Sequence, residues 1–390
     1  MLLCNVSIVG DQGLKNIRVA DGKIQSILLA EKIDGRGENK AVLEFEGALA
    51  FPGLINSHDH LDFNLFPSIR NKVYNNYTEW GRDIHEKNKI AINKVLNVRQ
   101  HLRVQWGIYK NLLNGFTTVV NHGTQLKTDH ELINIFQNTY SLHSIGFETK
   151  WKWKINNPLK NKWPFSIHIG EGKDEVSHKE IDELIKWNFF KKNVIGIHGV
   201  AMDETQAAHF HAVVWCPASN YFLLDKTASV NLIKEQTKII FGSDSTLTSS
   251  WNIWEHIRLA RNEKMLTDAE LFNTLTTEAA TVWRLRDIGN ISESQQADIV
   301  ITKLKKGLNS LDNFFSIEPE DILMIMQKGN IRLFDGELKS QMIKLNFSSA
   351  NFSKIKINGI LKYVAGDLPG LMNEIRKYYP EADFPFAISD

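Results

Sequence analysis

Two histidines, His58 and His60, follow the apolar stretch Ala48–Ile55 and are separated by one residue. Side chains alternate across a strand, so residues two apart point the same way and both imidazoles would lie on one face. Two imidazoles at the mouth of a buried strand are half of a divalent metal site. By the same alternation, Asp59 should point away from the metal. Taken alone, the pair is equally well explained as two surface histidines that flank an aspartate in a loop.

Three more polar residues stand at the ends of short apolar runs further along the chain. They are His168 after Phe165–Ile167, His198 after Asn193–Ile197, and Asp244 after Lys238–Ser243. Short apolar runs that alternate with helix-length segments predict repeated βα units and a parallel sheet. In a closed (β/α)8 barrel, residues at the carboxyl ends of different strands converge on one site. A single histidine beside an apolar run is more often a core or loop residue, so the shared position on separate strands carries the prediction.

With these segments the sequence resembles the amidohydrolase superfamily, and within it the branch of cytosine, guanine and S-adenosylhomocysteine deaminases and triazine chlorohydrolases. The matching stretches keep the family's order, in a resemblance that runs from the first residues to about Leu345: Pro52–His60, Gly115–Val120, His168–Glu171, Ile197–Val200, Cys216–Asn220 and Gly242–Ser245. The resemblance implies an α/β protein with a (β/α)8 TIM-type barrel, one divalent metal ion and a metal-bound water. The expected ion is Zn²⁺, with Fe²⁺ as the alternative.

The resemblance also assigns the ligands, which would come from strands one, one, five and eight: His58, His60, His168 and Asp244. Asp244 would in addition accept the proton of the attacking water. A site with two metals would make His198 a further ligand and would need a carboxylated lysine at the fourth strand. The nearest lysines are Lys150, Lys152 and Lys154. We expect the version with one metal.

Glu171 follows His168 by three residues, in the His-x-x-Glu arrangement of the deaminase branch. A carboxyl group in a dry pocket has a raised pKa and can pass a proton to a ring nitrogen and then to departing ammonia. The alternative is a solvated glutamate at the start of the polar stretch Gly172–Asp174. The resemblance favours the catalytic role, and it gives His198 the task of orienting and polarising the water or the intermediate.

These assignments predict a metal-dependent hydrolase that acts on carbon–nitrogen bonds other than peptide bonds. The first expectation is an aminohydrolase (deaminase) with a heterocyclic or amidine-like substrate. An amide, carbamate or carbon–halogen hydrolase on the same fold is the alternative, and ammonia release separates the two. A non-catalytic scaffold on this fold would have lost ligands, whereas every expected ligand is present.

Weaker candidates surround these residues. Ser219, Asn220 and His122 could bind substrate, although an ordinary turn and a structural histidine explain them as well. Phe63, Phe66 and Trp80 would wall the entrance or pack in the core. The remaining histidines have no partner pattern and are interpreted as structural or surface residues: His85, His101, His130, His143, His178, His209, His211 and His256.

Both ends of the chain are β-rich and flank an α/β centre. We predict a small β-sandwich from residues 1–51 and 291–345, the barrel from 52–290, and a C-terminal extension, 346–390, with an amphipathic helix over Asp367–Tyr379. Tyr140–Phe147 is expected as the third barrel strand. The irregular segment after it predicts a barrel trimmed near strand four, because a crossover needs a dozen or more residues. Within that segment, alternation over Lys150–Lys154 predicts a strand with tryptophans on one face and lysines on the other.

Composition limits the remaining possibilities. A chain of 390 residues, 43% of them hydrophobic, suits one large barrel plus a smaller domain. The formal net charge of +1 gives no electrostatic footprint for nucleic acid or an acidic membrane. The two cysteines, Cys4 and Cys216, exclude a disulfide framework and, with no signal-peptide pattern at the start, predict a cytoplasmic protein. We expect a small-molecule substrate and neither a nucleic-acid nor a membrane partner, and we leave a homodimer open.

Overall fold

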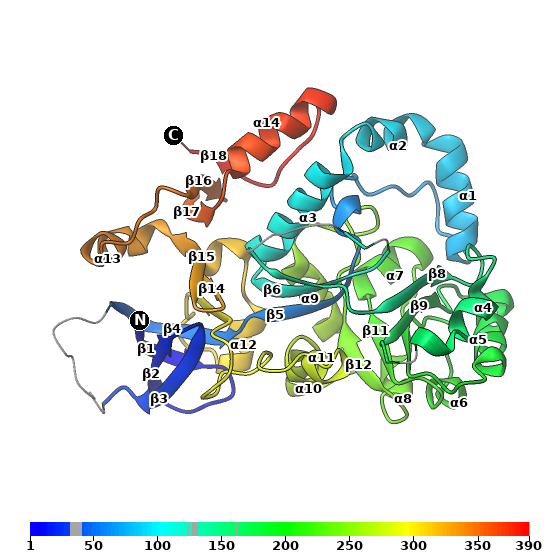
Figure 1. Cartoon of the computed structure of the whole chain (residues 1–390), viewed down its shortest axis with the longest axis horizontal. Helices are drawn as coiled ribbons and strands as arrows, with labels where there is room; N and C mark the ends of the chain where they lie inside the picture. The colour runs from blue at the N-terminus through cyan, green and yellow to red at the C-terminus, as the bar shows by residue number, and fades with distance from the viewer. Residues whose placement is uncertain (32–40, 124, 127–131, 161, 390) are drawn as a thin grey trace.

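A computed structural model describes residues 1–31, 41–123, 125–126, 132–160 and 162–389. Strands from both ends of the chain form one sheet at one end of the molecule (Figure 1), in the order β18-β16-β17-β15-β14-β13-β4-β1-β2-β3. Their bounds are β1 (Leu2–Ile8), β2 (Leu14–Ala20), β3 (Lys23–Leu29), β4 (Val42–Pro52), β13 (Ile299–Thr302), β14 (Ile322–Gln327), β15 (Asn330–Asp335), β16 (Phe352–Ile357), β17 (Ile360–Ala365) and β18 (Ala387–Ile388). Asp21 and Gly22, with φ of 50° and 75°, form the hairpin turn between β2 and β3.

The centre of the chain forms two parallel sheets, as the alternation of apolar runs and helical segments predicts. One sheet has the order β5-β6-β7 and the other β12-β11-β10-β9-β8. Their bounds are β5 (Leu54–Asp59), β6 (Phe116–Asn121), β7 (Asn134–Phe136), β8 (Tyr140–Ser144), β9 (Phe165–Ile169), β10 (Val194–His198), β11 (Ala212–Trp215) and β12 (Lys238–Phe241). Most of these strands are buried along their whole length, which explains why their sequences are continuous apolar runs rather than alternating ones.

The two parallel sheets meet where β12 ends beside β5. The Asp244 amide donates to the backbone oxygen of His58 at 3.1 Å. Gly242 permits this approach, because a Cβ atom there would lie 2.8 Å from His58 Cβ and 3.0 Å from Cys216 Sγ. The glycine therefore brings the end of β12 next to the histidine pair.

The region around β7 and β8 differs in detail from the sequence prediction. The strand expected over Tyr140–Phe147 ends at Ser144 and pairs with β9, and a separate short strand, β7, pairs with β6. Only residues 137–139 separate β7 from β8. A crossover between neighbouring parallel strands needs a dozen or more residues, and three are too few to form one. The chain therefore passes directly from β7 in one sheet to β8 in the other, without an intervening helix.

Helices cover the parallel sheets and fill the connections (Figure 1). Their bounds are α1 (Tyr77–Lys87), α2 (Lys89–Leu96), α3 (Gln100–Leu113), α4 (Trp151–Ile155), α5 (Glu175–Trp187), α6 (Glu204–Ala207), α7 (Pro217–Leu224), α8 (Val230–Ile233), α9 (Ile253–Asn262), α10 (Asp268–Thr274), α11 (Thr277–Val282), α12 (Ser310–Phe315), α13 (Lys339–Lys344) and α14 (Leu368–Tyr378). Short 3-10 turns are η1 (Leu61–Phe63), η2 (Pro158–Lys160), η3 (Pro319–Asp321) and η4 (Gly336–Leu338). In the part of the chain that the structure describes, no helix is long and apolar enough to cross a membrane.

The prediction of a strand over Lys150–Lys154 is wrong, because this segment contains helix α4. Trp151 and Ile155 are buried and stand four residues apart, which is the spacing of one helical face. Trp153, which the strand prediction placed with Trp151, is 83% exposed. Five alternating residues are too few to separate the two periods.

The C-terminal segment joins the ten-stranded sheet and docks on α3. The predicted helix over Asp367–Tyr379 is observed as α14, which packs against α3 (Figure 1). Tyr109 on α3 donates from its hydroxyl to the Ala365 oxygen at 3.0 Å, and Trp106 meets Phe384 edge to face at 5.0 Å. The tail thus covers the outer side of the helix that leads into β6.

Candidate metal centre and active-site cavity

Three histidine nitrogens converge at the carboxyl ends of β5 and β9. His168 Nε2 lies 3.2 Å from His58 Nε2 and 3.4 Å from His60 Nε2. Asp244, just after β12, places Oδ1 3.7 Å from His58 Nε2 and 3.9 Å from His60 Nε2. The structure therefore brings together the four side chains that the sequence predicts as ligands. Two overlapping groups of three could each hold a metal ion, one of His58, His60 and His168 and the other of His58, His198 and Asp244.

Hydrogen bonds hold these groups in a ligand-competent form. His168 Nδ1 donates to the His143 oxygen at 2.6 Å, which leaves Nε2 with its lone pair facing the other histidines. Burial and the neighbouring imidazoles lower the pKa of His58 and of His168 well below the ordinary value. Both rings are therefore neutral at neutral pH, as metal ligation requires.

Asp244 is held by hydroxyl and amide donors. Ser219 Oγ and Thr248 Oγ1 donate to Oδ2 at 2.8 and 2.9 Å, and the Ser245 amide donates to Oδ1 at 2.8 Å. Burial raises the pKa of the Asp244 carboxyl, but the imidazoles of His60 and His198 and the two hydroxyls lower it by more. The net shift is downward, so the carboxyl group is anionic at neutral pH.

Two of the site residues stand in a backbone region that residues other than glycine rarely occupy. Asp244 has φ of 54° and His198 has φ of 74°. Such a conformation costs on the order of 1–3 kcal/mol and persists only where the surroundings hold it. Here the strained backbone turns both side chains into the space above the strand ends.

Glu171 and His198 face one another beside the ligand cluster. His198 Nε2 lies 3.6 Å from Glu171 Oε1, and His198 Nδ1 donates to Asn220 Oδ1 at 2.8 Å. Burial raises the pKa of Glu171 well above the ordinary value, and the nearby carboxyl groups of Asp244 and Glu180 raise it further. A solvated glutamate, the alternative interpretation of the sequence, does not fit a side chain that is 6% exposed.

The weaker candidates hold the site rather than line it. Ser219 bonds Asp244, and Asn220 bonds His198 and donates to Thr227 Oγ1 at 3.1 Å. His122 is buried beside His168, with ring centroids 4.4 Å apart, and its Nε2 donates to the Leu142 oxygen at 2.9 Å. None of Ser219, Asn220 and His122 is among the residues that line the cavity.

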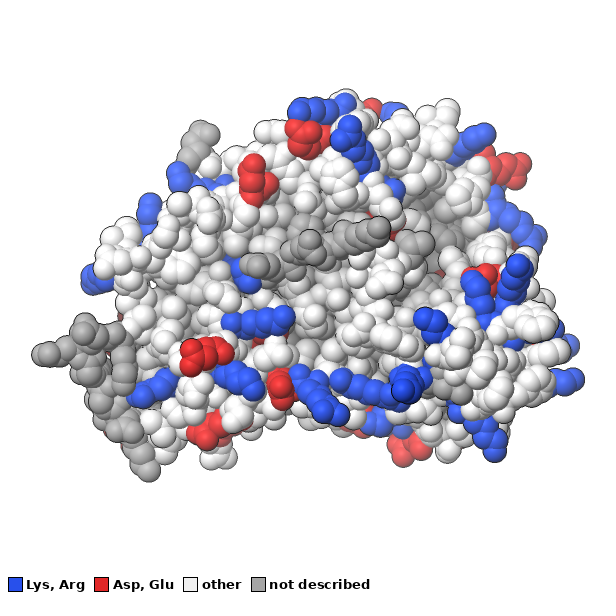
Figure 2. Space-filling view, viewed as in Figure 1, with Lys and Arg blue, Asp and Glu red and all other residues white. Residues whose placement is uncertain are grey.

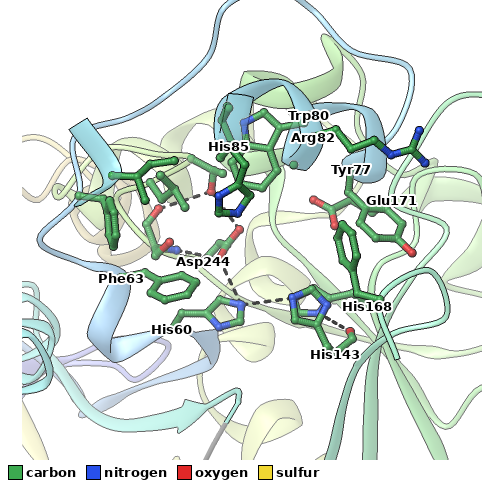
Figure 3. A pocket seen from close by; sticks show the side chains of 18 of the residues that line it. His60, Phe63, Tyr77, Trp80, Arg82, His85, His143, His168, Glu171 and Asp244 are labelled. Carbon is green, nitrogen blue, oxygen red and sulfur yellow. Dashed lines mark hydrogen bonds and ion pairs between the residues drawn. The ribbon is translucent and has the colours of Figure 1, made fainter. Parts of the chain in front are cut away.

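A cavity of about 540 Å³ opens above the ligand cluster (Figure 3). Its polar lining includes Asp244, Glu171, His198, His60 and His168. Its walls are mostly apolar. They include the three aromatic residues predicted at the entrance, Phe63, Phe66 and Trp80. The other apolar wall residues are Ile84, Ile92, Phe147 and Leu247. The Trp80 indole nitrogen donates to the Ile69 oxygen at 2.9 Å, so this ring presents carbon to the cavity.

Several residues around the cavity have no signal in the sequence. His85 points from α1 into the cavity (Figure 3), and His143 and Tyr77 also line it. Both histidines were interpreted as structural or surface residues, since neither belongs to a spaced pair. His130, from the same group, lies outside the described residues. The three lysines considered for a second metal do not line the cavity; Lys152 pairs with Glu183 and Lys154 with Glu148.

A buried polar network lies on the other side of the histidine strand. Asp59 points away from the ligand cluster, as strand alternation predicts, and accepts from Asn111 Nδ2 at 2.7 Å and Asn64 Nδ2 at 2.8 Å. Lys110 of α3 is fully buried. Its Nζ lies 3.3 Å from Asp59 Oδ2 and donates to the backbone oxygen of Asp244 at 3.1 Å. This network joins β5 to the loop after β12 beneath the site.

Sequence comparisons identify one family model and two known proteins that resemble this chain. The amidohydrolase family model matches residues 152–332. The chain is 23% identical to the 5-methylthioadenosine/S-adenosylhomocysteine deaminase of Caldicellulosiruptor saccharolyticus, with 83% of this chain and 89% of that protein covered. It is likewise 23% identical to the 5'-deoxyadenosine deaminase of Methanocaldococcus jannaschii, with 83% and 94% covered.

Solved structures show the same fold. A zinc-bound adenosine deaminase from Xanthomonas campestris superposes with a TM-score of 0.74 at 14% identity, covering 98% of both chains. A zinc complex of atrazine chlorohydrolase from Arthrobacter aurescens TC1 superposes with a TM-score of 0.68 at 14% identity. The superposition covers 88% of this chain and 99% of that one. These similarities show that the chain shares its overall fold with these proteins. The chain is similar in sequence to the amidohydrolase family model and to two deaminases, and in fold to an adenosine deaminase and a triazine hydrolase.

Proposed function

We propose that this protein is a metal-dependent aminohydrolase that releases ammonia from a heterocyclic or amidine-like carbon–nitrogen bond. The observation that carries the proposal is the position of Glu171. Its carboxyl group is buried, faces His198 at 3.6 Å, and lines the same cavity as the ligand cluster. A protonated acid beside a metal site is what the loss of a nitrogen leaving group needs, because an amide anion cannot depart unprotonated at neutral pH.

We assign the metal to the ligand set of three neutral imidazoles and one carboxylate: His58, His60, His168 and Asp244. When bound, a divalent cation supplies a Lewis acid that lowers the pKa of a coordinated water toward about 7. In this assignment Asp244 has a second role, since a carboxylate beside the attacking water can accept its proton.

The chain's own groups then divide the proton transfers. Glu171 donates a proton to the ring or amidine nitrogen, which its raised pKa favours. It then takes up one proton of the attacking water and delivers it to the departing amino group, which leaves as ammonia. The other water proton, accepted by Asp244, restores the protonated form of Glu171. His198 donates through Nδ1 to Asn220, so its Nε2 is the atom that meets the reacting group. Phe63 and Trp80 present aromatic carbon to the cavity, which supports a flat ring as the substrate. The names of the two curated relatives, both deaminases of adenine nucleosides, point the same way.

The proposal is tested by ammonia release from purified protein loaded with Zn²⁺ or Fe²⁺. The panel should hold aminopurines, aminopyrimidines, aminotriazines and arylamidines, each as a free base and with a ribosyl or an alkyl substituent. Matched amides, carbamates and chlorotriazines form the second arm. We expect ammonia from at least one amino compound and none from that compound in the presence of a chelator. Turnover confined to the second arm would replace deamination with the amide or carbon–halogen reaction.

We further propose that β5–β12 close a single barrel and that the flanking sheet folds as a small β-sandwich of residues 1–51 and 291–345. The bond between the Asp244 amide and the His58 backbone oxygen, which joins the end of β12 to β5, supports closure on that side. Residues 346–390 form an extension of the sandwich sheet. A cytoplasmic location is part of this proposal, and the two cysteines, which are both free and buried, support it.

A further inference from the structure

The end of the molecule that holds α4 and α5 exposes several large apolar side chains. Trp153 on α4 is 83% exposed and Leu159 in η2 is 86% exposed. Phe189 and Phe190, just after α5, are 66% and 52% exposed. An isolated exposed apolar residue needs no explanation, but a group of them on adjoining elements marks an interaction surface.

These elements are held side by side. The Asn156 side chain, at the end of α4, accepts from the Phe189 amide at 3.2 Å and donates to the Trp187 oxygen at 2.8 Å. Lys152 of α4 pairs with Glu183 of α5 at 2.7 Å, and its Nζ lies 4.5 Å from the centre of the Trp187 ring. These bonds hold α4 against α5 and the segment that carries Phe189 and Phe190.

Lysines surround this surface, and Figure 2 shows basic side chains gathered around uncharged surface at this end of the molecule. Lys150, Lys186 and Lys191 are exposed, and none of them pairs with an acidic group among the described residues. Lys160 is exposed as well, and its Nζ lies 6.0 Å from the centre of the Tyr140 ring. Residues 140–195 contain no arginine. We define the α4–α5 patch as Trp153, Leu159, Phe189, Phe190, Lys150, Lys160, Lys186 and Lys191.

Three of the apolar residues, Leu159, Phe189 and Phe190, lie in segments that lead to the amino ends of strands, whereas Lys150 follows Phe147 of the cavity wall by three residues. The segment after α4 leads into the amino end of β9, and the segment after α5 leads into the amino end of β10. The ligand cluster and Glu171 lie at the carboxyl ends of the same sheet.

We propose that the α4–α5 patch docks the protein on an anionic lipid surface. Tryptophan, phenylalanine and leucine side chains insert at the boundary between headgroups and acyl chains, and lysines around them are attracted to anionic headgroups. Two copies of the patch facing each other would set lysines against lysines, which disfavours a second copy of this chain as the occupant. The patch exposes leucine and phenylalanine side chains and contains no arginine, the residue that binds nucleic-acid phosphates bidentately. This composition fits a lipid surface better than nucleic acid. The net charge of the whole chain does not reveal this local concentration.

The test is co-sedimentation of the metal-loaded protein with vesicles at 0.1 M salt. We expect binding to vesicles of phosphatidylcholine with 30% phosphatidylserine, roughly tenfold or more above binding to phosphatidylcholine alone, and loss of binding at 0.5 M salt. Trp153→Ser with Phe189→Ser should lower the partition coefficient about tenfold or more. Lys150→Glu with Lys191→Glu should lower it roughly 20-fold or more.

Matched control variants separate the patch from general surface effects. Ile90→Ser with Leu232→Ser removes apolar side chains that are 79% and 49% exposed elsewhere, and Lys89→Glu with Lys344→Glu reverses two exposed lysines outside the patch. These controls should bind vesicles like the parent, and all variants should keep the parent's metal content and circular dichroism spectrum. Equal binding to both vesicle types, or equal losses in patch and control variants, would overturn the proposal. A dimer in size-exclusion chromatography that Trp153→Ser dissociates, or salt-sensitive binding of an RNA or DNA oligomer in place of vesicles, would also overturn it.

Discussion

Substitution of the buried lysine beneath the metal site tests how the fold holds the candidate centre. Lys110 Nζ donates to Asn64 Oδ1 at 2.8 Å and to the backbone oxygen of Asp244 at 3.1 Å. It also lies 3.3 Å from Asp59 Oδ2. Methionine has nearly the length of lysine but no charge, so Lys110→Met would leave the Asp59 carboxylate buried without its cation. We predict that the variant folds, is less stable than the parent, and binds metal more weakly.

The size of the stability loss follows from what remains around Asp59. Removing one partner of a buried ion pair costs about 3–5 kcal/mol. Asp59 would keep amide donors from Asn111 at 2.7 Å, Asn64 at 2.8 Å and Asn56 at 3.3 Å, so we expect the lower end, about 3 kcal/mol. In the double variant Asp59→Asn with Lys110→Met no charge is left unpaired. It should therefore be at least about 1 kcal/mol more stable than Lys110→Met alone.

Urea unfolding of the chelator-treated proteins measures this difference, because bound metal would add its own stabilisation to the folded state. Metal affinity is measured separately, and a loss of about 10–100-fold is expected for a group that supports a ligand from behind. An unfolding midpoint for Lys110→Met equal to that of the parent would refute the reasoning. So would a double variant that is less stable than the single one.

Three further predictions concern the chemistry. Purified protein should contain close to one equivalent of Zn or Fe by elemental analysis, and two tightly bound ions would contradict the mononuclear site. Asp244→Asn should preserve the circular dichroism spectrum yet lower turnover by about 10²–10⁴-fold, whereas Ser219→Ala, which leaves the Thr248 hydroxyl in place, should cost about 10–100-fold. Turnover of Asp244→Asn within a few-fold of the parent would remove this residue from the chemical centre. Glu171→Gln should lower kcat by roughly 10²-fold or more at unchanged metal content. Burial raises the pKa of Glu171, so its proton is present below that raised pKa and is lost as the pH rises through it. The rate of the parent should therefore fall on the alkaline side of the pH–rate profile. This alkaline limb should be absent from Glu171→Gln, which has no carboxyl group to titrate.

The ligand cluster could be predicted from sequence because two short-range regularities coincide there. Each ligand ends an apolar run, and parallel strands in a sheet place such run ends at one edge. His58 and His60 need only the two-residue period of a strand, and Asp59 follows the same rule toward the opposite side. None of this depends on knowing which helix covers which strand.

Residues supplied by helices were missed for a physical reason. Lys110 sits on α3 among other buried residues and reads as one more charged residue in a helical segment, yet it is 0% exposed. His85 and Tyr77 reach the cavity only because α1 folds over the strand ends, which is a long-range event. By contrast, Asn358 and Gly359, with φ of 46° and 81°, form the turn between β16 and β17, and this Asn-Gly hairpin signal was available in the sequence.

The contrast between strand-end residues and helix residues suggests that chemistry and substrate choice depend on different parts of the chain. The groups proposed to act on any substrate stand at strand ends and are locked by neighbours, as His198 is by Asn220 and Asp244 by Ser219. The walls that would select a substrate come instead from α1 and α2, with Trp80, Ile84 and Ile92, and these elements sit in the long connection between β5 and β6. Segments that join strands tolerate change far better than the strand ends do, because few backbone bonds of the sheet depend on them. Relatives with the same ligand pattern can therefore share a reaction and differ in substrate. For this chain, we therefore expect side-chain changes between Tyr77 and Leu96, where α1 and α2 supply part of the cavity wall, to alter substrate choice and to leave the ligand cluster in place.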